Sequence, residues 1–324
     1  MESAGELFKD LPVIRQALKE AATVTSSQQK LLDAATVIQL EPAAVERAYM
    51  ARQLVQCTLP HRNPGNVDRW LRRSGNVALV IQPGWDVEKD CSLGYPYGSI
   101  PRLLLFWVIT EAVQTKKRRL ELGRSLSEFM RELGLTPCSA GAGKRGDAKR
   151  LREQMRRLFA ARISFHQSVE GKERQGERWL NMDVAPKGEL WWDVKQPEQA
   201  ALWESWIELG EDFFNAVVTA PVPADLRALR ALKQSPLALD MYVWATYRAF
   251  SVSRKGVPQF VPWRGLMRQM GCDYGDLKDF KRHASKALGK VRAVYPALKI
   301  RSKPGGFDLL PCPPAVLPVI AGRA

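Results

Sequence analysis

The chain has 324 residues, of which 45% are hydrophobic and 26% charged, values typical of a globular protein with about two domains. Its longest apolar run, Leu103–Ile109, is too short to span a membrane, and its acidic N-terminus is unlike a signal peptide. Five scattered cysteines and three isolated histidines argue against a disulfide scaffold or a zinc site. We therefore expect a cytoplasmic protein with no metal, no cofactor and no contact with a membrane.

Positive charge is concentrated in two stretches of the chain. Lys and Arg number 49 against 34 Asp and Glu, so the formal net charge is +15. Residues 116–162 carry +9 and residues 277–303 carry +8, which leaves −2 for the rest of the chain. Such an excess indicates a polyanionic partner, most often nucleic acid.

The N-terminal residues 1–60 are predicted to form a helical extension. Leu7, Leu11, Ile14 and Leu18 recur at helical spacing, and a second helix is expected over residues 42–57, before Pro60. A turn over residues 60–65 then leads to a short apolar strand at residues 77–81.

The next elements form a pattern that occurs twice. The first copy is predicted as a helix over 99–115, a short strand at 120–122, a helix over 126–135 and a third helix over 148–161. Strands at 163–169, 179–184 and 189–192 follow the third helix. Helix starts are marked by Pro101 in a first turn, by the capping box Ser125–Glu128 and by Asp147.

The second copy is predicted as helix 236–250, strand 260–261, helix 262–271, helix 277–293 and strands at 298–301 and 307–310. Residues 129–134 match residues 266–271, and residues 146–151 match residues 275–280. Helix, strand, two helices and a hairpin is the order of a winged helix. We therefore predict an α+β fold with two tandem winged-helix domains, at residues 61–196 and 197–324, the second ending in a Pro-rich tail. The alternative is a chance similarity between two unrelated α+β segments.

The third helix of each copy has a basic face opposite its apolar face. Met155 and Phe280 belong to the two apolar faces and are expected in the core. A basic helix of this kind suits the major groove of DNA, where Arg can bind guanine and Lys or Arg can neutralise phosphates. The alternative, a solvated amphipathic helix, usually mixes both signs of charge. The candidate DNA-contacting residues are Lys149, Arg150, Arg152, Arg156 and Arg157 in the first copy and Lys278, Lys281, Arg282 and Lys286 in the second.

The hairpins that follow these helices are candidate wings, which would contact the DNA backbone or the minor groove. A solvated hairpin without a DNA contact is the alternative. The basic residues near the hairpins are Lys172, Arg174 and Arg178 in the first copy and Lys299, Arg301 and Lys303 in the second.

Enzymatic chemistry has little support in the sequence. The loop Gly141–Gly146 fits G-x-G-x-x-G, but it follows a helix where a dinucleotide site needs a strand, and it lacks the Ser or Thr of a Walker A motif. We interpret it as a loop that could hold a DNA phosphate at the start of the third helix. A nicking nuclease would need a metal-binding His pair, and His61, His166 and His283 are far apart in the sequence.

Several segments resemble the plasmid-encoded RepA replication initiators of Gram-negative bacteria. They are residues 52–62, 76–84, 95–102, 120–135, 151–159 and 235–244, and the length of the chain is similar to the IncW-type branch of that family. The resemblance covers residues 45–310 and implies a protein without catalytic residues.

The resemblance also implies partners and a role. Such a protein binds repeated sequences (iterons) in double-stranded origin DNA, promotes origin opening, recruits the host initiator and replicative helicase, and limits plasmid copy number by autoregulation. The residues leave open whether the chain forms a homodimer. A winged-helix transcriptional regulator is the main alternative, and a nicking rolling-circle initiator is a weaker one.

Overall fold

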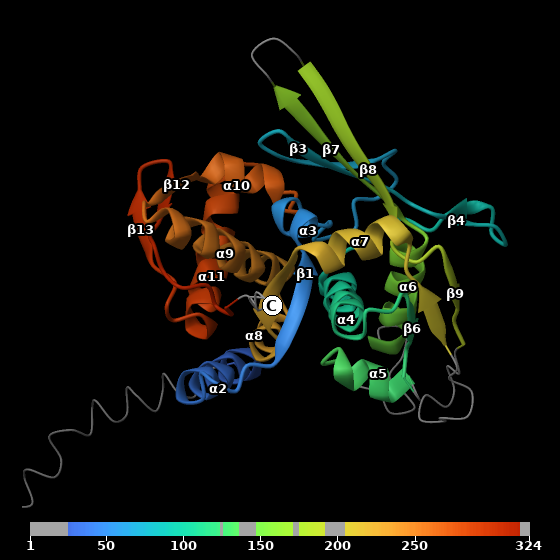
Figure 1. Cartoon of the computed structure of the whole chain (residues 1–324), viewed down its shortest axis with the longest axis horizontal. Helices are drawn as coiled ribbons and strands as arrows, with labels where there is room; N and C mark the ends of the chain where they lie inside the picture. Colours follow the sequence, from blue (N-terminus) through green and yellow to red (C-terminus); the bar gives the residue numbers. More distant parts are fainter. Residues whose placement is uncertain (1–24, 124–125, 136–146, 171–174, 192–204, 318–324) are drawn as a thin grey trace, which may run out of the picture.

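The computed structural model describes residues 25–123, 126–135, 147–170, 175–191 and 205–317. Two similarly ordered units flank a central segment of the chain (Figure 1). We call residues 99–183 the first unit and residues 236–309 the second unit. The helix predicted around Leu7–Leu18 and the loop 141–146 lie outside the described residues.

The order of elements in the first unit agrees with the prediction. It comprises α4 (Ser99–Thr115), β6 (Arg119–Glu121), α5 (Leu126–Glu132), α6 (Asp147–Phe159), β7 (Arg162–Glu170) and β8 (Gln175–Asp183). The last predicted strand forms slightly earlier in the chain, as β9 (Lys187–Glu189). Most of α4 is buried, as its apolar sequence predicts.

The second unit also has the predicted order. It comprises α9 (Pro236–Lys255), β12 (Gln259–Pro262), α10 (Trp263–Gln269), α11 (Leu277–Val294), β13 (Ile300–Lys303) and β14 (Gly306–Leu309). The side chains of Ser235 and Asp276 accept hydrogen bonds from the first turns of α9 and α11, at 3.2 and 2.7 Å, which confirms both predicted helix starts.

The sheets of the two units differ. In the second unit β12 pairs with the hairpin, in the order β12-β14-β13. In the first unit the hairpin β7–β8 instead pairs with two earlier strands, β2 (Trp70–Ser74) and β3 (Val77–Gln82), in the order β2-β3-β7-β8. The short strand β6 pairs with β10 (Trp206–Glu208), which in turn pairs with β9. The two copies therefore share an element order but not a pairing scheme.

The prediction of a helix over residues 42–57 is wrong for most of its length. The segment forms strand β1 (Arg47–Ala51) and then only one short helix, α3 (Arg52–Gln56). Strand β1 pairs antiparallel with β11 (Pro221–Asp225), and Ala48, Met50 and Ala51 are buried. Pairing with a strand some 170 residues away overrides the local helical pattern. The preceding helix α2 (Ser26–Leu40) contacts α8 (Leu226–Leu232) and α11.

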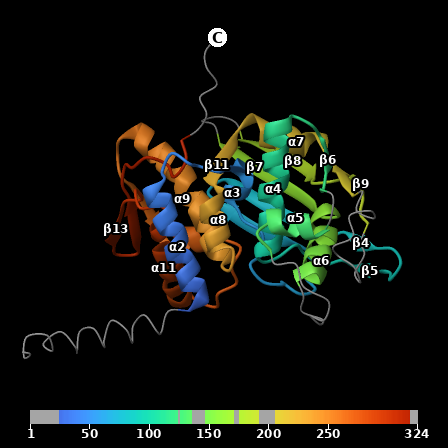
Figure 2. The same ribbon diagram turned by 90° about the horizontal axis from the view of Figure 1, so that it is seen from below.

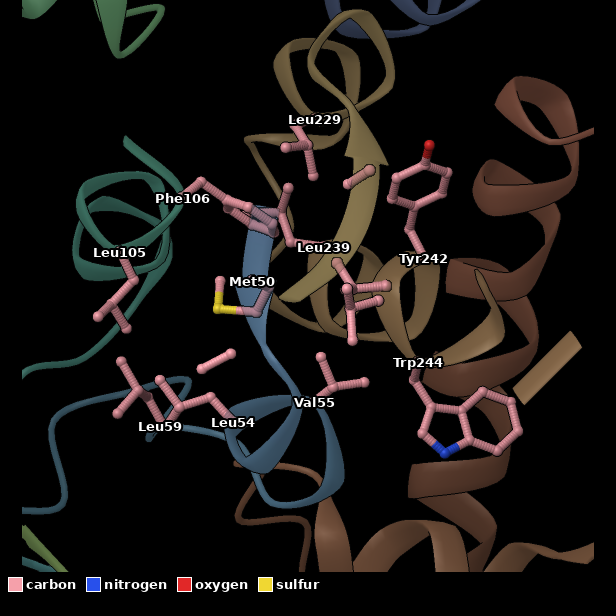
Figure 3. Close-up of a cluster of buried hydrophobic side chains, with 14 of the residues drawn as sticks. Met50, Leu54, Val55, Leu59, Leu105, Phe106, Leu229, Leu239, Tyr242 and Trp244 are labelled. Atoms are coloured by element: carbon pink, nitrogen blue, oxygen red, sulfur yellow. The ribbon is translucent and has the colours of Figure 1, made fainter. Parts of the chain in front are cut away.

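The central segment, β1 and α3, lies in the middle of a continuous core. Figure 3 shows Met50 and Leu54 on this segment, with Phe106 of α4 on one side and Leu239 and Trp244 of α9 on the other. Each of these side chains is buried. Strand β10 and helix α7 (Glu211–Thr219) contact elements of the first unit. The domain bounds at residues 60 and 196 stay a prediction.

A polar junction beside this core joins the second unit to the chain segment that precedes the first unit. The hydroxyl of Thr58 accepts a hydrogen bond of 2.6 Å from the backbone N–H of Gly271, in the turn between α10 and α11. The backbone N–H of His61 donates to the carbonyl of Gly271, also at 2.6 Å. Arg72 of β2 donates to the carbonyls of Met270 and Cys272, at 3.1 and 3.2 Å. The start of α11 is therefore fixed to the chain segment that precedes the first unit.

Gly271→Ala should destabilise the protein because the junction has no room for a methyl group. An ideal Cβ at this position would lie 1.5 Å from the carbonyl oxygen of Leu59. We expect a loss of about 1–3 kcal/mol or more in the free energy of unfolding, measured by urea titration. Gly289→Ala is the matched control in α11, where a Cβ meets nothing within 4 Å, and should stabilise the helix by about 0.5–1 kcal/mol. Equal stability of the two variants would contradict this account of the junction.

Candidate nucleic-acid interface

Helix α11 exposes the basic face that its sequence predicts. Phe280, Ala284 and Val291 are fully buried on the opposite face. Arg282 forms an ion pair of 3.0 Å with Asp279 one turn earlier, and both side chains remain more than half exposed. The predicted contact residues Lys278, Lys281, Arg282 and Lys286 are all exposed.

The structure adds basic residues that the sequence reasoning did not include. Arg264 and Arg268 are exposed on α10, the helix that precedes α11 through the junction turn, and Lys290 is exposed on α11. The sequence could have indicated the two arginines of α10, because the helix before a DNA-facing helix commonly supplies phosphate contacts.

Arg62 is a further addition that the linear sequence could not place. It is exposed and directly follows His61, whose backbone N–H binds the carbonyl of Gly271 in the turn before α11. The charges of Arg62 and Arg282 both act on Tyr274, three residues before α11. Burial raises the pKa of the Tyr274 hydroxyl, and the two guanidinium groups oppose that shift. The junction therefore brings a basic residue from outside the second unit to the beginning of α11.

The hairpin β13–β14 carries a fixed pair of cations. Arg301 and Lys303 bind the carboxylate of Asp308 at 2.7 and 2.8 Å. Asp308 is 3% exposed, whereas about half of each basic side chain faces solvent. Hydrogen bonds from Lys303 and Arg301 hold the pKa of Asp308 below its usual range. The carboxylate thus orients two of the three basic side chains predicted near this hairpin, and the third, Lys299, is exposed immediately before β13.

Helix α6 differs from α11, because two of its basic side chains, Arg156 and Arg157, contact other elements of the protein. Arg150 pairs with Asp147 at 3.2 Å, and Arg156 pairs with the buried Asp86 at 3.0 Å. Arg157 lies over the ring of Tyr97, 5.1 Å from its centroid, and is half-buried. Arg156 and Arg157 are therefore only partly exposed on the predicted basic face, whereas the burial predicted for Met155 is confirmed.

Two short strands supply the partner of Arg156. The hairpin β4 (Trp85–Asp86) and β5 (Cys91–Ser92) places Asp86 beside α6. Burial alone would raise the pKa of Asp86, but the Arg156 guanidinium and Lys89 together lower it. A sequence pattern along α6 contains no signal for this acid 70 residues away. Among the remaining predicted residues, Lys149 and Arg178 are exposed, Arg152 is half-buried, and Lys172 and Arg174 lie outside the described residues.

A cavity of about 370 Å³ separates the start of α6 from the junction. Arg62, Arg150 and Lys233 line it together with Asp147 and Glu153. Because the charges are mixed, the cavity does not resemble an anion site. No cluster of His, Cys, Asp or Glu suited to a metal ion occurs among the described residues. In the same part of the chain no helix is both long and apolar enough to cross a membrane.

The stability that Asp308 contributes should depend on pH. Its pKa is lower in the folded protein than in the unfolded chain, so the carboxylate stabilises the fold above the unfolded value of ~3.9. This contribution is lost as the pH falls through the folded pKa. Asp308→Asn should therefore lower the melting temperature at pH 7 and have a much smaller effect near pH 3. A difference of the same size at both pH values would contradict the assigned ion pairs.

Comparison with known proteins gives one family. Residues 95–264, more than half of the chain, match the family described as plasmid encoded RepA protein. Among solved structures, the crystal structure of RctB domains 2-3 aligns with a TM-score of 0.45 and 13% identity, covering 80% of this chain and 96% of that chain. A selenomethionine form of the same two RctB domains aligns with a TM-score of 0.46 and 12% identity, covering 80% and 95%. No curated protein sequence matches the chain. The chain belongs to the family of plasmid-encoded RepA proteins, which are replication initiators.

Proposed function

We propose that this protein initiates replication of a plasmid by binding repeated sequences, or iterons, in the origin. The observation that carries the proposal is the exposed basic face of α11, with Arg301 and Lys303 oriented beside it by the buried Asp308. Both units are then winged helices, with α6 and α11 as their DNA-facing helices and the hairpins as wings. Family membership supports the biological role, and the charge of +15 supports the polyanionic partner.

The two units contribute differently to DNA binding in this proposal. Base readout falls mainly to α11, because Arg156 and Arg157 of α6 contact Asp86 and Tyr97, whereas the predicted contact residues of α11 are all exposed. The first unit then adds phosphate contacts through its exposed basic side chains, Lys149, Arg150 and Arg178. The junction holds the two units in a fixed relation, as is needed for docking in two adjacent major grooves about 10 bp apart.

Later steps of initiation rest on the family alone. We propose that binding promotes origin opening, that the protein recruits the host initiator and replicative helicase, and that it represses its own gene and limits copy number in the cytoplasm. The protein performs no catalysis in this scheme. Assignment to the IncW-type branch and formation of a homodimer stay predictions.

Arg282→Ala should weaken binding to the cognate repeat by about 1–3 kcal/mol and binding to random duplex much less. Because the Arg282–Asp279 pair is exposed, the melting temperature should hardly change. Arg157→Ala should instead destabilise the fold by about 1 kcal/mol, since Arg157 packs on Tyr97. Competition binding with both duplexes, beside thermal melts, measures these effects.

The matched control for these variants is Lys30→Ala, an exposed base on α2. It should change neither affinity nor melting temperature. If Arg157→Ala leaves the fold intact and abolishes discrimination between the duplexes, α6 rather than α11 is the reading helix.

An origin-transformation assay distinguishes an initiator from a transcriptional regulator. A replicon that carries only the candidate origin is introduced into a host that expresses the protein from another locus. An initiator should maintain the replicon, and Arg282→Ala should reduce the number of transformants. A protein that represses its own promoter in a reporter strain but never sustains the replicon would be a regulator only.

A further inference from the structure

The four-stranded sheet of the first unit has one buried face and one face open to solvent. Residues paired directly across neighbouring strands lie on the same face of a sheet. Leu79, Phe165 and Met182 belong to the buried face. Figure 1 shows the sheet above α4 and α6, and in Figure 2 it lies behind them. The open face therefore points away from α6.

A row of side chains crosses this open face from one edge strand to the other. Trp179 of β8 pairs directly with His166 of β7, which pairs with Ala78 of β3, which pairs with Arg73 of β2. Trp179 is 67% exposed, and His166 and Arg73 are exposed as well. The row thus presents an indole and an imidazole side by side, with their Cβ atoms ~5 Å apart, and a guanidinium beyond the small Ala78.

The row from Trp179 to Arg73 contains one guanidinium and no carboxylate. Arg162, at the beginning of β7, lies four residues before His166 and is exposed on the same face. Strands β2 and β3 contribute no carboxylate to this face, and the acids Glu177 and Asp183 belong to the edge strand β8, where Asp183 pairs directly with Arg162. The exposed Asn181 and Gln82 add amide groups that can hydrogen-bond to bases.

We propose that this open face, defined by Arg73, Arg162, His166 and Trp179, binds single-stranded DNA. Flat aromatic side chains on an open sheet stack on unpaired bases, and neighbouring cations hold the phosphates. A duplex keeps its base faces inside the stack, so it offers nothing for Trp179 to stack on. The inference rests on the proposed function, because origin opening would supply the strand. It places that strand on the side of the first unit away from α6.

Binding of a labelled oligothymidylate of about 16 nucleotides, followed by fluorescence anisotropy, tests the proposal. Trp179→Ala should weaken this binding about 5- to 150-fold, and Trp179→Phe should restore most of it. Trp85→Ala is the matched control, since Trp85 is also 58% exposed but lies on the hairpin β4–β5. Because Trp179 is so exposed, its variants should melt at the wild-type temperature.

Two further measurements separate this site from the duplex site. Trp179→Ala should weaken binding to the oligothymidylate far more than binding to duplex DNA, whereas Arg282→Ala should weaken duplex binding and retain the oligothymidylate. Photocrosslinking of a bromodeoxyuridine-substituted oligonucleotide should label the peptide that contains Trp179 or His166.

Several results would overturn the proposal. Wild-type affinity of Trp179→Ala for the oligothymidylate, an equal loss in Trp85→Ala, or crosslinks confined to α11 would each do so. A change in molar mass of Trp179→Ala by light scattering would assign the face to self-association instead. If the wild-type protein bound the oligothymidylate but not duplex origin DNA, the result would count against the proposed function and not against this site.

Discussion

The buried ion pair between Arg102 of α4 and Asp240 of α9 is the contact on which the arrangement of the two units depends. Both oxygens of Asp240 accept from the guanidinium at 2.7 Å, and the two side chains are 3% and 9% exposed. Burial alone would raise the pKa of Asp240, but Arg102 and a hydrogen bond from His61 lower it to about 2. Removing either partner would leave an uncompensated buried charge, at a cost of about 3–5 kcal/mol. The pair therefore fixes the position of α4 relative to α9, the first helices of the two units.

The same guanidinium also determines the path of the chain that enters the first unit. Arg102 donates to the carbonyls of Leu59, Pro60 and Gly98, at 2.6–3.0 Å. The segment held in this way, Thr58–His61, carries the hydrogen bonds to Gly271. One side chain thus fixes α4, α9 and the turn that begins α11. Because the turn cannot move without breaking these bonds, the direction of the exposed basic face is determined by contacts outside the second unit.

Local patterns predicted the helices and their buried faces, but not the long-range partners. Capping residues such as Asp276 and apolar positions such as Phe280 are read from neighbours within one or two turns, and both predictions were confirmed. Strand β1 was missed because its alternating burial exists only through pairing with β11. The partial burial of Arg157 was missed because a helical plot gives an angle around the axis and contains nothing about Tyr97. Arg62 was missed for the same reason, since only the junction brings it to α11.

The differences between the two units follow from what each sheet must bury. In the second unit the hairpin pairs with β12 inside one compact unit, and the basic side chains of α11 remain exposed to solvent. In the first unit the hairpin pairs with β2 and β3, and the adjoining hairpin β4–β5 brings Asp86 against α6. The same pairing builds a wider sheet whose outer face nothing in the unit needs to cover. The same element order has therefore produced a helix with an exposed basic face in the second unit. In the first unit it has produced a helix whose Arg156 and Arg157 contact Asp86 and Tyr97, beside an open sheet with Trp179 on its surface.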